Sequence, residues 1–248
     1  MNVVDQSGIR TELSGGTAIV RLVKPPVNSL DIELLARLEE EVTRLGQTDA
    51  VRSIVLTGSG KAFSAGVDLH RVLEGGRPYT ERLITRMSSC FETIYSVPMP
   101  VVAAVNGHAI AGGCALALAC DVRYMSPGKF GLNELALGLA FPPVILEIIA
   151  TVLGERAYPV ITGAQLYTAE EALDLGMIDR VAAAEELERE AMAESGRLGS
   201  IAVPAFVATK RALRARPHNR DTAVVAADLA ADWLMPANLE RFQAIVRR

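Results

Sequence analysis

Residues 101–121 read VVAAVNGHAIAGGCALALACD, and this stretch decides the fold. It opens with five apolar residues, Val101–Val105, which predict a buried strand. Asn106-Gly107 ends that strand, and small residues around Gly112-Gly113 predict a tight turn that opens into a helix reaching Cys120. A buried strand that passes into a helix is the building unit of an α/β protein.

The same arrangement occurs earlier in the chain. A predicted strand, Ser53–Thr57, ends in a glycine turn and is followed by Phe63-Ser64-Ala65-Gly66-Val67-Asp68-Leu69. Turns of this kind leave backbone N–H groups free, and two of them side by side aim two donors at one oxygen, as in an oxyanion hole. On the residues alone, a second interpretation stays open, in which the small residues serve only tight turns and helix packing. Neither turn carries the pattern of a Walker or dinucleotide site.

The rest of the chain extends this pattern in both directions. Strands separated by helices predict an α/β fold with parallel strands. Further strands are predicted at Ala18–Leu22, Val122–Met125 and Ile178–Val181, and helices from the Asp31 N-cap to about Leu45, at about 80–95 and at about 144–153.

The alternation of predicted strands and helices ends at about Glu185. No strand pattern follows, and three helical stretches are expected up to Arg248. One of them carries an apolar stripe that has to be buried against the main domain or another subunit. The stripe is formed by Ala223, Ala226, Ala227, Ala230 and Leu234.

Composition excludes several classes of protein. The 248 residues are 50% hydrophobic and 22% charged with a net charge of -4, which argues against nucleic acid as a partner. The three cysteines indicate a reducing compartment rather than a disulfide framework. No uncharged run is long enough for a membrane span, and the N-terminus lacks the core of a signal peptide, so we expect a soluble, cytoplasmic protein. The widely spaced His70, His108 and His218 show no metal-ligand pattern, so no metal site is predicted.

Several motifs together resemble the crotonase (enoyl-CoA hydratase/isomerase) superfamily. The resemblance implies an α/β fold built as a right-handed spiral of ββα turns, followed by helices that form trimers, often paired into hexamers. On this basis we expect a spiral core over residues 1–195, a helical oligomerisation region over 196–248, and a homotrimer or dimer of trimers. The motifs are PPVNSL (25–30), FSAGVDL (63–69), NGHAIAGGCALALACD (106–121), GLNE (131–134), TAEEA (168–172) and LGMI (175–178).

The resemblance also implies an acyl-CoA substrate and the residues that hold it. Val67 and Gly112 match the two N–H donors that bind the thioester carbonyl, and coenzyme A enters as part of the substrate, with no permanently bound cofactor. The segment along the adenine and pantetheine matches Ala65, Gly66, Asp68 and Leu69, and Lys24 is predicted to contribute to cofactor binding at the CoA phosphates.

The number of carboxylates distinguishes the reactions of this superfamily. The hydratases that this chain resembles use two glutamates to hold and activate water. By that resemblance, the first glutamate position is occupied here by Ala115, and the second keeps its acid, Glu134. One carboxylate can move a proton between neighbouring carbons, and Glu134 lies in an apolar run, Phe130–Phe141, that should raise its pKa. Without the resemblance, a solvated or paired surface acid on a loop is the favoured interpretation of Glu134.

The motifs look most like those of the Δ3,Δ2-enoyl-CoA isomerases, in which one Glu takes a proton from C2 of a 3-enoyl-CoA and returns it to C4. The sequence therefore predicts an enoyl-CoA isomerase with Glu134 as acid and base. Open alternatives are an atypical hydratase, a decarboxylase, a thioesterase or a non-catalytic acyl-CoA-binding protein.

Overall fold

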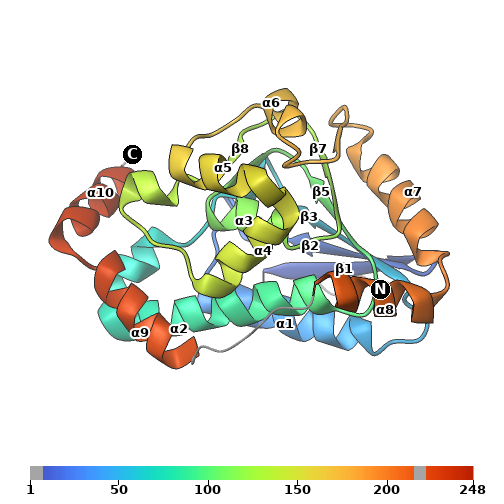
Figure 1. Ribbon diagram of the computed structural model, residues 1–248, viewed down its shortest axis with the longest axis horizontal. Coiled ribbons are helices and arrows are strands. Elements are labelled where there is room, and N and C mark those ends of the chain that lie inside the picture. The colour runs from blue at the N-terminus through green and yellow to red at the C-terminus, as the bar shows by residue number, and fades with distance from the viewer. Residues whose placement is uncertain (1–7, 215–221, 248) are drawn as a thin grey trace.

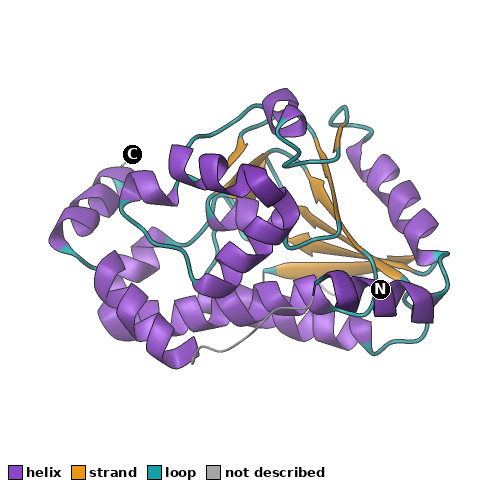
Figure 2. Cartoon of the chain, in the orientation of Figure 1, coloured by secondary structure: helices purple, strands orange, loops and turns teal. Residues whose placement is uncertain are grey.

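The computed structural model describes residues 8–214 and 222–247. Its strands gather in the middle of the molecule with helices outside them (Figures 1 and 2). The first pair of strands in the main sheet is antiparallel, through a strand at residues 9–14 that the sequence analysis did not predict. The remaining pairs are parallel, as predicted. The six strands lie in the order β1 (Ile9–Ser14), β2 (Thr17–Leu22), β3 (Ser53–Gly58), β5 (Val101–Val105), β7 (Val122–Met125) and β9 (Arg180–Val181).

A second, three-stranded parallel sheet corrects one expectation from the sequence. It consists of β4 (Ala62–Ser64), β6 (His108–Ile110) and β8 (Phe130–Gly131). Each of these short strands directly follows a strand of the main sheet. The sequence analysis expected a turn between each main strand and the next helix, whereas the structure has a second, short strand in that place. Two or three residues are too few to show a periodic pattern. The repeat agrees with the spiral of ββα turns that the resemblance implied.

The predicted helices are confirmed, with different limits. Helix α1 (Ile32–Gly46) begins at Asp31, whose side chain accepts a hydrogen bond from the Leu34 N–H. Helix α2 (Leu69–Ser96) starts earlier than expected because Asp68 caps it, and Gly76 and Pro78 interrupt its first part. The others before residue 180 are α3 (Gly112–Leu118), α4 (Pro143–Leu153), α5 (Ala157–Gly163) and α6 (Ala169–Asp174), with 3-10 turns η1 (Glu134–Leu137) and η2 (Gly154–Arg156).

The C-terminal part contains four described helices rather than three. They are α7 (Leu187–Gly199), α8 (Val203–Leu213), α9 (Thr222–Trp233) and α10 (Pro236–Val246). Helix α7 packs on the main sheet, where Leu187 and Ala191 meet Val55 and Val102. The expected boundary between residues 195 and 196 falls inside α7, and the division into a core and an oligomerisation region stays a prediction.

The apolar stripe of α9 is buried within the same chain. Ala226, Leu229, Ala230 and Trp233 are buried, and the helix packs along α2 (Figure 1). The sequence analysis expected the stripe to pack against either the main domain or another subunit, and in the single chain it packs against the main domain. The Ala223 side chain lies outside the described part of the chain, as does His218.

A buried ion-pair cluster fixes α8 to the sheet. Lys210 Nζ lies 2.8 Å from Asp121 Oδ2 and donates to the Met99 carbonyl oxygen, and an Arg214 guanidinium nitrogen lies 2.8 Å from Asp121 Oδ1. Burial lowers the pKa of Lys210, and the Asp121 carboxylate opposes that shift. Removing one partner of such a buried pair typically destabilises a protein by about 3–5 kcal/mol, so Lys210 stabilises the folded state.

The three cysteines are free and buried, in agreement with the predicted absence of a disulfide framework. Burial raises the pKa of each thiol, which keeps it protonated. Within residues 8–214 and 222–247, no helix combines the length and apolarity that a membrane span needs.

Candidate active site

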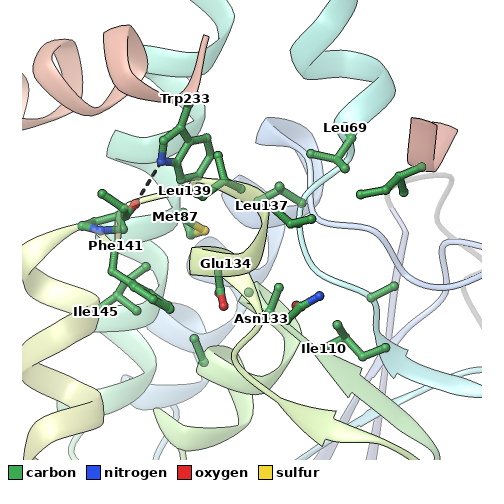
Figure 3. Close-up of a pocket in the computed structure, with 18 residues that line it drawn as sticks. Leu69, Met87, Ile110, Asn133, Glu134, Leu137, Leu139, Phe141, Ile145 and Trp233 are labelled. Atoms are coloured by element: carbon green, nitrogen blue, oxygen red, sulfur yellow. Dashed lines mark hydrogen bonds between the residues drawn. The ribbon is translucent and has the colours of Figure 1, made fainter. Parts of the chain in front are cut away.

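A mostly apolar cavity of about 150 Å³ lies where the two motif turns meet η1, α4 and the C-terminal helices. Figure 3 shows the side chains that line it. They come from segments as far apart in sequence as Ala65 and Ile245. The cavity therefore forms only when the spiral and the C-terminal helices are both in place.

The turn between β4 and α2 places Val67 in the lining of this cavity. Leu30 pairs with Val67 as in a parallel sheet: the Leu30 N–H donates to the Gly66 carbonyl oxygen (2.8 Å) and the Asp68 N–H donates to the Leu30 carbonyl oxygen (2.9 Å). In a parallel pair of this kind, the N–H of the central residue points away from its partner segment. The Val67 N–H is thus directed away from Leu30, and Val67 lines the cavity.

The turn between β6 and α3 presents a second N–H at Gly112. Gly112 is the first residue of α3, where N–H groups lack acceptors inside the helix. Ala111 before it has φ 52° and ψ −123°, a strained conformation for a residue with a side chain. The Ala111 N–H holds this conformation by donating to the Gly131 carbonyl oxygen (2.8 Å), and its own carbonyl accepts from the Ala115 N–H (3.0 Å).

Two glycines allow the turns to approach each other. A side chain at Gly66 would place its Cβ 3.2 Å from the Gly112 nitrogen and 3.0 Å from the Ile110 carbonyl oxygen. A Cβ at Gly113 would lie 2.1 Å from the Ser64 carbonyl oxygen, which no side chain can tolerate. Val67 and Gly112 therefore line the same cavity, as an oxyanion hole built from their N–H groups would require.

Glu134 supplies the carboxylate of the cavity wall. It is the first residue of η1, is 8% exposed, and its Oε2 atom is buried without a hydrogen-bond partner. Burial raises the pKa of Glu134 to about 8. Glu134 is the one carboxylate among the described residues that line the cavity. Ala115, which stands at the position of the first glutamate of the hydratases, also lines it.

The neighbouring Asn133 is a polar group that the sequence analysis did not select. Its Oδ1 atom is buried without a partner and the residue lines the same cavity as Glu134. Buried polar atoms without partners are uncommon in folded proteins, and at a cavity they indicate a bound polar group. The GLNE motif contains this residue, but no pattern in the sequence indicates that it lines the cavity.

Apolar side chains form most of the cavity wall around Glu134. In Figure 3, Met87, Leu139, Phe141, Ile145 and Trp233 lie on one side of Glu134, and Ile110 lies on the other. The Trp233 indole Nε1–H donates to the Ala140 carbonyl oxygen (2.9 Å), which fixes the ring against the segment after η1.

Sequence reasoning missed Trp233 and Ile245 as well, both from the C-terminal helices. The signal was present for Trp233, because it continues the buried face of α9 three residues after Ala230. Because the sequence analysis placed this helix in the oligomerisation region, it did not predict that the helix contributes to the cavity.

The predicted site residues divide into two groups. Ala65, Val67, Leu69, Gly112 and Glu134 line the cavity, and Gly66 lies directly beneath it as the contact between the turns. Lys24 and Asp68 are not part of its lining. Lys24 binds Asp31 and Asp68, and Asp68 caps α2, so both belong to the support of the β4–α2 turn.

The raised pKa of Glu134 predicts a pH-dependent gain in stability for Glu134→Gln. Between pH 4.5 and about 8 the folded protein keeps a proton that the unfolded chain releases, so wild-type stability falls as pH rises through this window. Glutamine carries no charge at any pH. The free energy of unfolding of Glu134→Gln, relative to wild type, should therefore increase between pH 5 and pH 8.5, by up to a few kcal/mol. Urea denaturation at both pH values measures it.

The exposed Glu74 provides the matched control, because Glu74→Gln should show no such increase. A stability difference for Glu134→Gln that stays constant from pH 5 to 8.5 would contradict burial of the charge.

Comparison with known proteins agrees with this geometry. A family model described as enoyl-CoA hydratase/isomerase matches residues 12–236. A putative enoyl-CoA hydratase of Thermus thermophilus is 36% identical over 208 residues, covering 82% of each chain. The mouse mitochondrial enoyl-CoA delta isomerase 1 is 31% identical over 74% of this chain and 65% of its own length.

Solved structures with the same fold include proteins named as isomerases and proteins named as hydratases. Human mitochondrial delta3-delta2-enoyl-CoA isomerase superposes with a TM-score of 0.89 at 25% identity, covering 97% of both chains. An enoyl-CoA hydratase from Bacillus halodurans gives a TM-score of 0.83 at 25% identity, over 96% of this chain and 100% of the other. The family match covers most of the sequence and includes both motif turns, so this chain belongs to the enoyl-CoA hydratase/isomerase family.

Proposed function

We propose that this protein is an enoyl-CoA isomerase that converts a 3-enoyl-CoA into the conjugated 2-enoyl-CoA. The observation that carries the proposal is the cavity wall, where two N–H donors and one buried carboxylate, Glu134, meet and Ala115 leaves no second acid. Coenzyme A enters as part of the substrate, with its pantetheine passing along Ala65 and Leu69. Gly66 and Asp68 support that segment from behind.

The reaction follows from these groups. The thioester oxygen accepts hydrogen bonds from the Val67 and Gly112 N–H groups, which stabilise the negative charge that develops when C2 loses a proton. The Glu134 carboxylate takes that proton, the double bond shifts, and the protonated Glu134 returns the proton to C4. A pKa near 8 suits both steps, because a general acid and base works best when its pKa is close to the operating pH.

Hydration of a 2-enoyl-CoA is the second candidate, and Asn133 is the observation that favours it. Asn133 Oδ1 and Glu134 Oε2 are both buried acceptors without partners, and a water molecule with two hydrogens could satisfy both. The Thermus thermophilus relative carries a hydratase name, whereas the mouse relative carries an isomerase name. Isomerisation remains the preferred reaction because it needs only the one carboxylate.

The size of the cavity favours a short acyl chain. A cavity of about 150 Å³ in a protein core accommodates a group the size of benzene, or about six carbons. Trp233 is a large side chain in the cavity wall, and its hydrogen bond to the Ala140 carbonyl oxygen holds the ring in place. We therefore propose acyl chains of about six carbons or fewer as the preferred substrates.

We also propose that the protein forms a homotrimer or a dimer of trimers in the cytoplasm. Large apolar side chains remain exposed on the C-terminal helices of the single chain, with Leu213 74% exposed and Val224 59% exposed. Exposed apolar side chains of this size are available for contacts between subunits.

The first test concerns the base. Glu134→Gln keeps the shape of the side chain and removes the proton carrier, so the isomerisation rate should fall by about 10²–10⁴-fold while CoA-ester binding is kept. The absorbance of the conjugated thioester measures isomerisation, and a hydration assay runs on the same preparation. Glu74→Gln is the control. Near-normal turnover of Glu134→Gln would exclude this mechanism, and wild-type hydration faster than isomerisation would favour the second candidate.

The second test concerns chain length. Trp233→Ala should raise the ratio of kcat/KM for a ten-carbon over a six-carbon substrate by at least about tenfold, because it removes a large side chain from the cavity wall. Trp233→Phe, which keeps the bulk and loses only the bond to Ala140, should retain the wild-type preference. A folded Trp233→Ala enzyme with unchanged chain-length preference would show that Trp233 does not limit the substrate.

The third test concerns assembly. Light scattering of the purified protein should give the mass of three or six chains, because burial of the exposed apolar side chains on α8 and α9 favours association. Activity measured at nanomolar concentration provides the functional comparison. A monomer that remains active would contradict the proposed assembly.

A further inference from the structure

Lys24 makes a set of contacts that its predicted role at the CoA phosphates does not explain. Its Nζ atom lies 2.5 Å from Asp31 Oδ2, 3.0 Å from the Ser29 carbonyl oxygen and 3.3 Å from Asp68 Oδ2. An ammonium group has three N–H donors, so these acceptors match its full capacity. The lysine is engaged within the protein and has no donor left for a phosphate.

The two carboxylates that it joins are the N-caps of two helices. Asp31 Oδ1 accepts from the Leu34 N–H at the start of α1 (2.8 Å), and Asp68 Oδ1 accepts from the Arg71 N–H at the start of α2 (3.3 Å). Each carboxylate thus gives one oxygen to its helix and the other to Lys24. The lysine ties together the starting points of α1 and α2.

These caps are directly adjacent in sequence to the paired residues of the oxyanion hole. Asp31 follows Leu30 and Asp68 follows Val67, and Leu30 and Val67 form the backbone pair that directs the Val67 N–H away from Leu30. A change in the separation of Asp31 and Asp68 would therefore be transmitted over a single peptide unit to Val67.

The charges explain why a cation is required. The Asp31 and Asp68 side chains are only 9% and 17% exposed, so solvent screens their mutual repulsion weakly. Lys24 itself is 26% exposed and places its charge between them. Without it, two carboxylates would face each other at the point where the β4–α2 turn is held.

We propose that Lys24 is a positioning residue of the oxyanion hole, which bridges Asp31 and Asp68, offsets the repulsion between them and thereby fixes the Val67 N–H. The inference rests on the proposed function only in requiring an enolate at this site. Lys24 is not among the residues that line the cavity, and its three donors are used within the protein, so its loss should slow proton abstraction without weakening binding of the CoA portion.

The test uses exchange of the C2 protons of a saturated thioester, butyryl-CoA, with deuterium from solvent. This reaction needs the oxyanion hole and Glu134 but no double-bond shift and no hydration. Lys24→Met should lower the maximal exchange rate by about 10–100-fold and change the half-saturating concentration little, because displacing a donor by a fraction of an ångström weakens the stabilisation of the enolate. Lys129→Met, which removes an exposed positive charge, is the control and should exchange normally.

Butyryl-pantetheine, which lacks the nucleotide phosphates, separates positioning from phosphate binding. If Lys24 positions Val67, Lys24→Met slows exchange of butyryl-CoA and butyryl-pantetheine by the same factor. If Lys24 instead binds a phosphate, the half-saturating concentration rises for butyryl-CoA alone and butyryl-pantetheine is unaffected, which would overturn the inference.

A compensating substitution guards against a general loss of structure. Asp68→Asn removes one of the two charges and keeps a side chain that caps helices well. The double variant Lys24→Met/Asp68→Asn should therefore regain a substantial part of the exchange rate lost in Lys24→Met. A thermal transition confirms folding of each variant. If Lys24→Met is folded and exchanges as fast as wild type, or if Asp68→Asn gives no recovery, Lys24 does not act in this way. Wild-type isomerisation and hydration rates test the proposed function separately.

Discussion

The close contact between the β4–α2 turn and the β6–α3 turn is the constraint on which the rest of the site depends. Gly113 lets α3 begin directly against the Ser64 carbonyl, and Gly66 lets the other turn lie against the Gly112 nitrogen. Two short strands, β4 and β6, pair with each other and hold the turns at this distance. The strained Ala111 shows that the fold imposes this geometry, because its conformation persists only where surrounding contacts enforce it.

The catalytic proposal depends on a second feature, the burial of one ionisable group. Glu134 lies among apolar side chains with an unpartnered oxygen, and its pKa of about 8 reflects the cost of a charge there. The same burial that reduces stability when Glu134 is ionised makes its carboxylate a stronger base. The C-terminal helices contribute to this burial, since Trp233 and Ile245 line the cavity. The helices first expected to serve assembly therefore also complete the site of the single chain.

Much of this arrangement could be predicted from the sequence. Strands β5 and β7 have the limits expected from their apolar runs, and the Asp31 cap sets the start of α1 as predicted. The short strands β4, β6 and β8 escaped prediction because they are defined by partners far away in sequence. Trp233 continues the buried face of α9, but its place in the cavity escaped prediction because that helix was assigned to oligomerisation and its contact with Ala140 joins segments 93 residues apart. Lys24 was selected for its charge, but only the structure shows that this charge faces two helix caps.

The central claim is that the Val67 and Gly112 N–H groups hold one thioester oxygen in front of Glu134. A crystal structure with butyryl-CoA bound tests it most directly. The account predicts that the thioester oxygen lies about 2.7–3.1 Å from both nitrogens, with C2 facing the Glu134 carboxylate and the acyl chain directed toward Trp233. A thioester held elsewhere, or an oxygen bonded to neither nitrogen, would contradict it.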